Sequence, residues 1–253
     1  MNTATSIGAT WKNIPLRADY AHDLDAMANA VDAETKLIYI CNPNNPTGTL
    51  TPIDKIIPFC KTVARKAPVF IDEAYIELLE KPEAQSAVGL IKEGHDVIIS
   101  RTFSKVHGMA GLRIGYMVAS AERVKMIQNI VRTEMGISVT SLEGALASLK
   151  DIEFQEYTRE NNIKNRNYVF AELEKAGMNP IPSYTSFVIP DTNICKRHDG
   201  KDVRKTRRYQ WLPNTGEALR AGKHRHHGRT QAICKNASGN CKLTDDAKAA
   251  SWR

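Results

Sequence analysis

VIISRTFSKVHGMAGLRIG, residues 97–115, opens with a short apolar run and continues into a polar segment that contains a lysine, two glycines and two arginines. A short, mostly apolar run that ends in polar turn residues is typical of a buried strand. The sequence therefore predicts one strand over residues 97–100 and another over residues 115–119. Lys105 and Arg113 lie in the polar segment between the two predicted strands.

Two further predicted strands end in polar motifs. The apolar residues 37–41 precede the sequence NPNNPTG, and residues 68–71 precede DEAY, which begins at Asp72 and ends at Tyr75. Continuous apolar strands that alternate with helices form a parallel sheet that is covered on both faces. In such sheets ligands bind at the carboxyl ends of the strands, so we expect the polar motifs to meet there.

The remaining elements follow from apolar periodicity and from capping residues. Thr51 is predicted to cap a helix whose buried side contains Ile53, Ile56, Ile57, Cys60 and Val63. Further expected elements are a helix that begins at Ser120 or Ala121 and includes Val131, a helix over residues 154–176 that stops at Gly177, and a strand over residues 186–189. The predicted fold class is α/β, with a mostly parallel sheet and helices on both faces.

The charge distribution, the hydropathy and the cysteine spacing exclude some classes of function. Residues 196–253 carry 15 Lys and Arg against 5 Asp and Glu, whereas the rest of the chain carries 20 against 23, so the net charge of +7 belongs to the tail. That distribution argues against nucleic-acid binding by the protein as a whole. No apolar stretch is long enough to cross a membrane, and no signal peptide is evident. The five cysteines show no disulfide spacing, so we expect free thiols and a cytoplasmic location.

Each polar motif also has an ordinary interpretation when it is taken alone. An Asn/Pro/Gly cluster is usually a turn, an Asp after a strand is usually a helix cap, and a Ser-Lys pair before glycines is usually a surface loop. Three such motifs in this order, each at a strand end, favour a shared binding site.

The three motifs together resemble those of the fold-type-I aminotransferases of classes I and II, which use pyridoxal 5'-phosphate (PLP), and in particular the histidinol-phosphate aminotransferase group. The stretches that carry the resemblance are YICNPNNPTGT, FIDEAYIE and SRTFSKVHGMAGLRIGY, and the similarity extends over residues 15–189. The resemblance implies that residues 1–150 form the PLP-binding large domain and that residues 151–192 begin the small domain. It also implies a homodimer, a small-molecule amino donor and a 2-oxo acid as partners, with no nucleic acid, membrane or metal.

The resemblance also assigns roles to individual residues. Lys105 would form the Schiff base with PLP and later move a proton, and Asp72 would pair with the protonated pyridine nitrogen. Asn45 and Tyr75 would bond to the phenolic oxygen of the ring. The phosphate would be bound by the Arg113 guanidinium and by the hydroxyls of Thr102 and Ser104, on a loop that Gly108 and Gly111 allow to turn tightly.

Four nearby residues are given no principal role. His107, close to Lys105, is more often structural than catalytic in such a position. We expect Glu73 and Glu77 to be solvated or structural. Arg101 could add to the phosphate environment but ranks below Arg113.

Both ends of the chain depart from the family pattern. Residues that family members place before the position of Pro15, and that contact the phosphate and the ring, have no counterpart here. The family segment R-V-S-I-G-T, whose arginine binds the substrate carboxylate, is also absent from residues 193–253. Alternatives for this basic tail are a nucleic-acid arm and a metal site that uses His224, His226, His227, Cys234 and Cys241.

A shifted reading frame explains the tail best. When Ala221 to Thr230 are written in degenerate codons and read one nucleotide later, the triplets permit R-V-S-I-G-T. The shift would fall between Ile194 and Gly216. On this hypothesis the tail is poorly ordered, because it cannot bury enough apolar area to offset chain entropy.

The resemblance predicts transamination of L-histidinol phosphate with 2-oxoglutarate, and the departures at both ends predict weak or no activity for this chain. A decarboxylase of the threonine-phosphate type shares the same motifs. A non-catalytic fragment with a basic tail is the alternative from another class.

Overall fold

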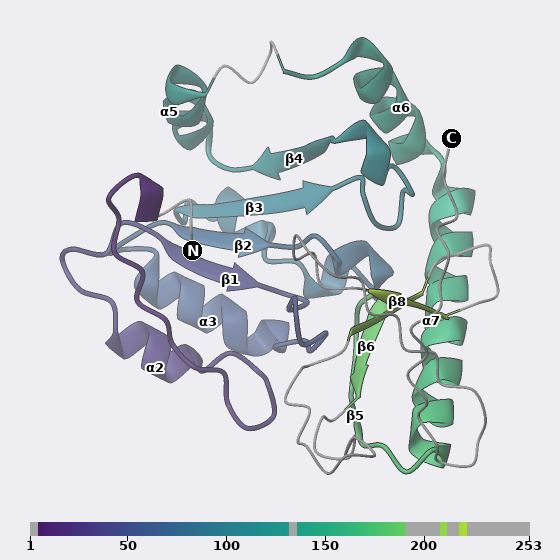
Figure 1. The fold of residues 1–253 in the computed structure, drawn as a ribbon. Helices are drawn as coiled ribbons and strands as arrows, with labels where there is room; N and C mark the ends of the chain where they lie inside the picture. The colour runs from purple at the N-terminus through teal and green to yellow at the C-terminus, as the bar shows by residue number, and fades with distance from the viewer. Residues whose placement is uncertain (1–4, 132–135, 191–207, 212–217, 222–253) are drawn as a thin grey trace.

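A computed structural model of the chain describes residues 5–131, 136–190, 208–211 and 218–221 (Figure 1). The first sheet has the order β1-β2-β3-β4, with β1 at Ile38–Cys41, β2 at Val69–Asp72, β3 at Val97–Thr102 and β4 at Gly115–Val118. β1, β2 and β3 are parallel to one another, and β4 is antiparallel to β3. The sheet is therefore mostly parallel, as predicted, with one antiparallel edge strand.

The register of the sheet brings the polar motifs to one edge. Cys41 pairs with Asp72, and Asp72 pairs with Ser100. The segments that follow β1, β2 and β3 consequently begin at the same level. This confirms the expectation that the three strand ends meet.

Within the described residues, three helices pack against the apolar residues of the first sheet. They are α2 (Leu24–Asn29), α3 (Ile53–Val63) and α4 (Gly89–Lys92), and Figure 1 shows α2 and α3 together on one side of the sheet. The main core joins Ile40, Ile71 and Ile99 of the strands to residues of α3 and α4, of which the fully buried ones are Ile56, Cys60, Val63 and Leu90. The burial of these aliphatic side chains stabilises the layered arrangement.

The predicted cap of α3 is wrong. Pro52 occupies the N-cap position and makes no side-chain cap bond. The Thr51 hydroxyl instead accepts the backbone N–H of His22 at 3.2 Å, and the Thr51 backbone bonds to the side chain of Asn42. Thr51 is therefore held by the loop that follows β1 and is not available to the helix.

Short 3-10 helices lie near the strand ends. They are η1 at Ile76–Leu78, η2 at Glu83–Gln85 and η3 at Ala110–Leu112. α5 at Ala121–Ile130 begins at Ala121, as predicted, with the Ser120 hydroxyl as its cap, but it ends one residue before Val131, which was predicted to lie within it. α6 at Val139–Lys150 had no counterpart among the predicted elements.

A second sheet follows the long helix α7, Ile152–Lys175. Its order is β5-β6-β7-β8, with β5 at Pro180–Ile181, β6 at Phe187–Pro190, β7 at Arg208–Trp211 and β8 at Ala218–Ala221. Figure 1 shows α7 alongside this sheet. α7 begins two residues before the predicted start because Asp151 caps it, and it ends just before Gly177, whose φ is +72°.

β7 and β8 were not predicted, because the tail lacks sustained periodicity. The other residues of 191–253 lie outside the described residues, so the reading-frame hypothesis, the poorly ordered tail and the His/Cys metal site stay predictions. The division into domains is also a prediction.

The described part of the chain also bears on membrane-spanning helices, metal-binding clusters and the state of the cysteines. Within it, none of the helices combines the length and the apolar composition that a membrane crossing requires. The same residues contain no cluster of three or more His, Cys, Asp or Glu side chains that could bind a metal ion. Cys41 and Cys60 are buried free thiols.

Candidate active site

Lys105 and Asn45 come from two different loops, and both contact Tyr75, which lies on a third. The Lys105 Nζ lies 4.7 Å from the centroid of the Tyr75 ring, within the range of a cation–π interaction. The Asn45 amide Nδ2 donates to the Tyr75 hydroxyl at 3.2 Å. Tyr75 is buried and its ring packs edge-on against Phe187 of β6, so the second sheet helps to fix this group.

Asp72, at the end of β2, is surrounded by neutral donors. Its Oδ1 accepts the Ser100 hydroxyl at 3.2 Å and the Ala74 N–H at 3.1 Å, and its Oδ2 accepts the Tyr39 hydroxyl at 3.1 Å. No Lys, Arg or His within the described ranges forms an ion pair with it. The carboxylate is therefore oriented but keeps its charge unpaired, which suits a cationic ligand group.

Thr102 and Ser104 form a small hydroxyl cluster at the end of β3. The Thr102 hydroxyl donates to the Ser104 Oγ at 3.0 Å and accepts the Ser104 N–H at 3.1 Å. The loop that follows is closed by the bond from the Gly108 N–H to the Lys105 carbonyl, and Gly108 has a φ of +69°. Gly111 has no such positive φ, so Gly108 alone supplies the special conformation that was expected of both.

Arg113 is exposed and bonded to its own loop. Its Nη1 donates to the Ala110 carbonyl at 2.9 Å. The backbone of Arg113 has a φ of +51°, a left-handed conformation that costs a residue with a side chain about 1–3 kcal/mol and that concentrates at functional sites. The structure thus brings Thr102 and Ser104 together, and it leaves the Arg113 guanidinium outside their hydrogen-bond cluster.

Comparison with known proteins identifies the family. The model for "Aminotransferase class I and II" matches residues 2–195. The chain belongs to this family. It is 39% identical over 186 residues to a histidinol-phosphate aminotransferase of Bacillus velezensis, which covers 74% of this chain and 51% of that protein. It is 36% identical over 222 residues to histidinol-phosphate aminotransferase 2 of Ralstonia nicotianae, which covers 83% of this chain and 59% of that protein. The chain therefore spans about half the length of the curated relatives it matches.

Solved structures confirm the predicted fold class. The histidinol-phosphate aminotransferase of Sinorhizobium meliloti, in complex with pyridoxal-5'-phosphate, matches with a TM-score of 0.70 at 27% identity and covers 76% of this chain and 52% of that one. The enzyme of Clostridium acetobutylicum matches with a TM-score of 0.69 at 27% identity and covers 75% of this chain and 57% of that one. This aminotransferase-family chain therefore has the fold-type-I architecture that its motifs indicated.

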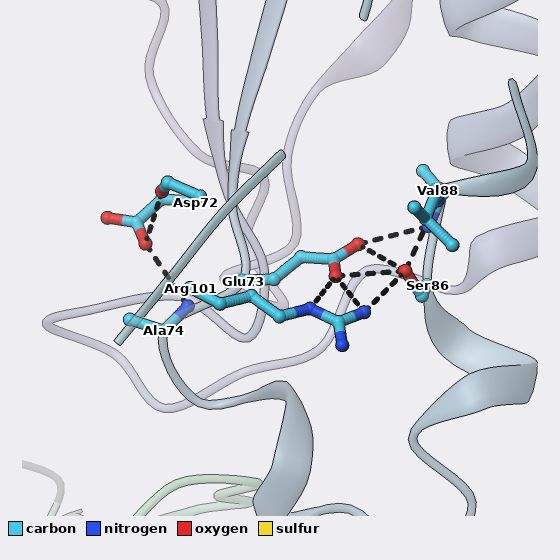
Figure 2. Close-up of polar contacts among 8 residues, drawn as sticks. Asp72, Glu73, Ala74, Ser86, Val88 and Arg101 are labelled. Atoms are coloured by element: carbon cyan, nitrogen blue, oxygen red, sulfur yellow. Dashed lines mark hydrogen bonds and ion pairs between the residues drawn. The ribbon is translucent and has the colours of Figure 1, made fainter. Parts of the chain in front are cut away.

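Glu73 and Arg101 have a structural role in this aminotransferase-family chain. Arg101 donates to Glu73 Oε2 through Nη2 at 2.8 Å and through Nε at 3.0 Å, and it also bonds to Ser86. Glu73 is 1% exposed and also accepts bonds from the Ser86 hydroxyl and the Ala87 N–H. Figure 2 shows the Glu73 and Asp72 carboxylates on opposite sides of the chain after β2. Arg101 therefore ties the ends of β2 and β3 together, and the phosphate role considered for it receives no support.

His107 also acts structurally. It is 6% exposed, its Nδ1 lies 2.8 Å from the Ser148 hydroxyl of α6, and its ring contacts that of Phe103. Burial lowers the pKa of the imidazole. These contacts match the structural role expected of His107.

Glu77 is buried without full hydrogen bonding. It is 8% exposed, and its Oε2 has no hydrogen-bond partner within the described part of the chain. Burial raises the pKa of its carboxyl to about 7, and its backbone carbonyl accepts Arg159 of α7 at 3.0 Å. Glu77 thus lies where η1 meets α7, in an environment that favours the neutral acid.

This environment predicts a pH-dependent stability. The folded-state pKa of Glu77 lies above its unfolded value, so the folded chain binds the extra proton and loses stability as pH rises through about 7. Between pH 5 and pH 8 the wild type should lose about 2 kcal/mol more unfolding free energy than Glu77→Gln. Urea unfolding of both proteins at the two pH values measures this difference, and parallel pH profiles would contradict it.

Two residues near Asp72 were missed as functional candidates. Tyr39 and Ser100 supply hydrogen bonds to its carboxylate from β1 and β3. Strand alternation contains the signal, because Tyr39 lies two residues before Cys41 and shares its side of the sheet. Once the register of β1 and β2 is known, Tyr39 can be identified as the residue diagonally opposite Asp72.

Proposed function

We propose that this chain binds pyridoxal 5'-phosphate at the ends of β1, β2 and β3 and transfers an amino group between an amino donor and a 2-oxo acid, at the low rate that its departures from the family pattern predict. The contact set of the Lys105 amine, the Tyr75 ring and the Asn45 amide carries the proposal. Family membership supports it, because the motifs that hold these residues lie within the matched region.

The residues present fit the chemical groups of the cofactor. Asp72 offers a carboxylate without an ion-pair partner in the described part of the chain, which suits a protonated pyridine nitrogen. Asn45 and Tyr75 offer an amide and a hydroxyl for the phenolic oxygen of the ring. The hydroxyls of Thr102 and Ser104 suit phosphate oxygens, and Arg113 lies on the same loop as a cation for them.

The protein groups have distinct tasks in the proposed reaction. When bound, PLP supplies an electron sink for the electron pair released at the substrate Cα. The Lys105 amine would hold the cofactor through its aldehyde carbon, with loss of water, and, once an amino donor has displaced it, would move the proton released at the donor Cα. Asp72 holds the ring nitrogen in its charged form, and the loop of Thr102 and Ser104 anchors the phosphate.

The substrate pair that we propose is L-histidinol phosphate with 2-oxoglutarate. Its support is that relatives 36–39% identical to this chain carry the name histidinol-phosphate aminotransferase. We also propose a homodimer in the cytoplasm.

A single-turnover experiment tests the function. The purified chain is saturated with PLP, freed of excess cofactor and mixed with L-histidinol phosphate, L-glutamate or L-threonine phosphate. Conversion of the bound cofactor from its aldehyde form to its amine form, fastest with L-histidinol phosphate, is the expected result. Release of carbon dioxide from L-threonine phosphate would favour the decarboxylase alternative, and bound PLP that no donor converts would contradict transamination.

A further inference from the structure

Tyr39 occupies an unusual position for a residue in the middle of a strand. Its neighbours on β1, Ile38 and Ile40, are 6% and 0% exposed, whereas Tyr39 is 40% exposed. Its ring stacks on that of Phe70, its register partner on β2, at 5.8 Å and 17°. Tyr39 therefore lies on the face of the sheet opposite to Ile38 and Ile40.

The hydroxyl of Tyr39 reaches Asp72, two residues after Phe70. It donates to Asp72 Oδ2 at 3.1 Å, whereas Oδ1 takes both of the other donors, the Ser100 hydroxyl and the Ala74 N–H. An ionised carboxylate has about four acceptor sites, two on each oxygen. Within the described residues the three bonds therefore leave one acceptor site open, and it lies on Oδ2 beside the Tyr39 hydroxyl.

Tyr39 acts as a hydrogen-bond donor over the whole working pH range. Burial, with the nearby Cys41 and Asp72, raises the pKa of its phenol above the usual value. Burial likewise raises the pKa of the Cys41 thiol to about 11. The Tyr39 hydroxyl and the Cys41 thiol near Asp72 are consequently neutral, and Tyr39 can orient the carboxylate without pairing its charge.

We propose that Tyr39 is a positioning residue for Asp72, which fixes the rotation of the carboxylate so that its open acceptor site is presented to the ring nitrogen of bound cofactor. The inference rests on the proposed function, because it assigns Asp72 to the pyridine nitrogen of PLP. The stacked ring of Phe70 holds the phenol in place, and the hydrogen bond from the hydroxyl restricts the rotation of the Asp72 carboxylate. Tyr39 itself acts only through the carboxylate.

The variant Tyr39→Phe tests the contribution of the hydroxyl apart from that of the aromatic ring. The variant keeps the stack on Phe70 and removes the bond to Oδ2. We expect PLP to bind about tenfold more weakly, as the loss of one hydrogen bond to a charged group implies. Phe70→Leu is the matched control, because it disturbs the stack and leaves the hydroxyl present. Phe70→Leu should weaken PLP binding clearly less than Tyr39→Phe does, even if it lowers the free energy of unfolding as much or more.

A double-mutant cycle tests whether Tyr39 acts through Asp72. PLP affinity is measured by absorbance titration for the wild type, Tyr39→Phe, Asp72→Ala and the double variant. The expected result is that Tyr39→Phe has no further effect once Asp72 is replaced. An undiminished effect in the Asp72→Ala background, or a Tyr39→Phe variant that binds as tightly as the wild type, would overturn the positioning role. Failure of the wild type itself to bind PLP would instead overturn the proposed function, and this inference with it.

Discussion

Glu73→Gln should lower the free energy of unfolding by about 3 kcal/mol, because it leaves the Arg101 guanidinium without its anionic partner in a largely buried site. The Glu73 side chain is 2% exposed and that of Arg101 is 20% exposed. Glu73 also accepts the Ser86 hydroxyl and the Ala87 N–H, so its charge stabilises several donors at once. Urea unfolding followed by circular dichroism measures the loss.

An exposed ion pair between α3 and the end of α4 provides the control. Glu93 pairs with Lys61 at 2.7 Å, but its side chain is 52% exposed. Water competes for both charges at such a site, so Glu93→Gln should leave the unfolding free energy nearly unchanged. Equal losses in the two variants would show that burial of the Glu73–Arg101 pair has no special role.

Lys105→Ala should slow the conversion of bound cofactor by amino donor by about 10²–10⁴-fold, the usual contribution of a positioned acid–base group. The Lys105 amine is the group that lies over the Tyr75 ring, whose hydroxyl accepts the amide of Asn45. Without it, no amine at this place can move the proton between the donor Cα and the cofactor C4′. Stopped-flow absorbance on the PLP-saturated variant measures the rate.

Two controls make this prediction specific. Lys66→Ala removes an exposed lysine that follows α3 and should leave the rate unchanged. Added methylamine should restore part of the rate in Lys105→Ala, because a small free amine can enter the space left by the side chain. A variant that keeps the wild-type rate would show that another base moves the proton.

Much of the candidate site followed from the sequence because its residues are adjacent to strand ends. The apolar runs before Asn42, Asp72 and Arg101 predicted β1 and β2 to within one residue and the start of β3, which continues two residues further than predicted, to Thr102. Parallel pairing then required their loops to meet. The contacts between Asn45, Tyr75 and Lys105 agree with that prediction. Local pattern was sufficient here because each motif is continuous in the chain.

The features that the sequence did not predict depend on tertiary register. β4 is antiparallel, and no property of residues 115–119 distinguishes that pairing from a parallel one. The bond from Tyr39 to Asp72 requires the diagonal between neighbouring strands. The Glu73–Arg101–Ser86 cluster joins three separate segments, so the sequence left open whether the Glu73 carboxylate is solvated or structural, and the fold buries it.

Attachment of the cofactor gives the most direct test of the central claim, that the strand ends of the first sheet form a PLP site around Lys105. The wild-type chain is incubated with PLP, reduced with borohydride, digested and mapped by mass spectrometry. Pyridoxyl modification concentrated on the peptide that contains Lys105 is the predicted result. Modification spread over exposed lysines, with Lys105 marked no more than Lys66, would contradict the account.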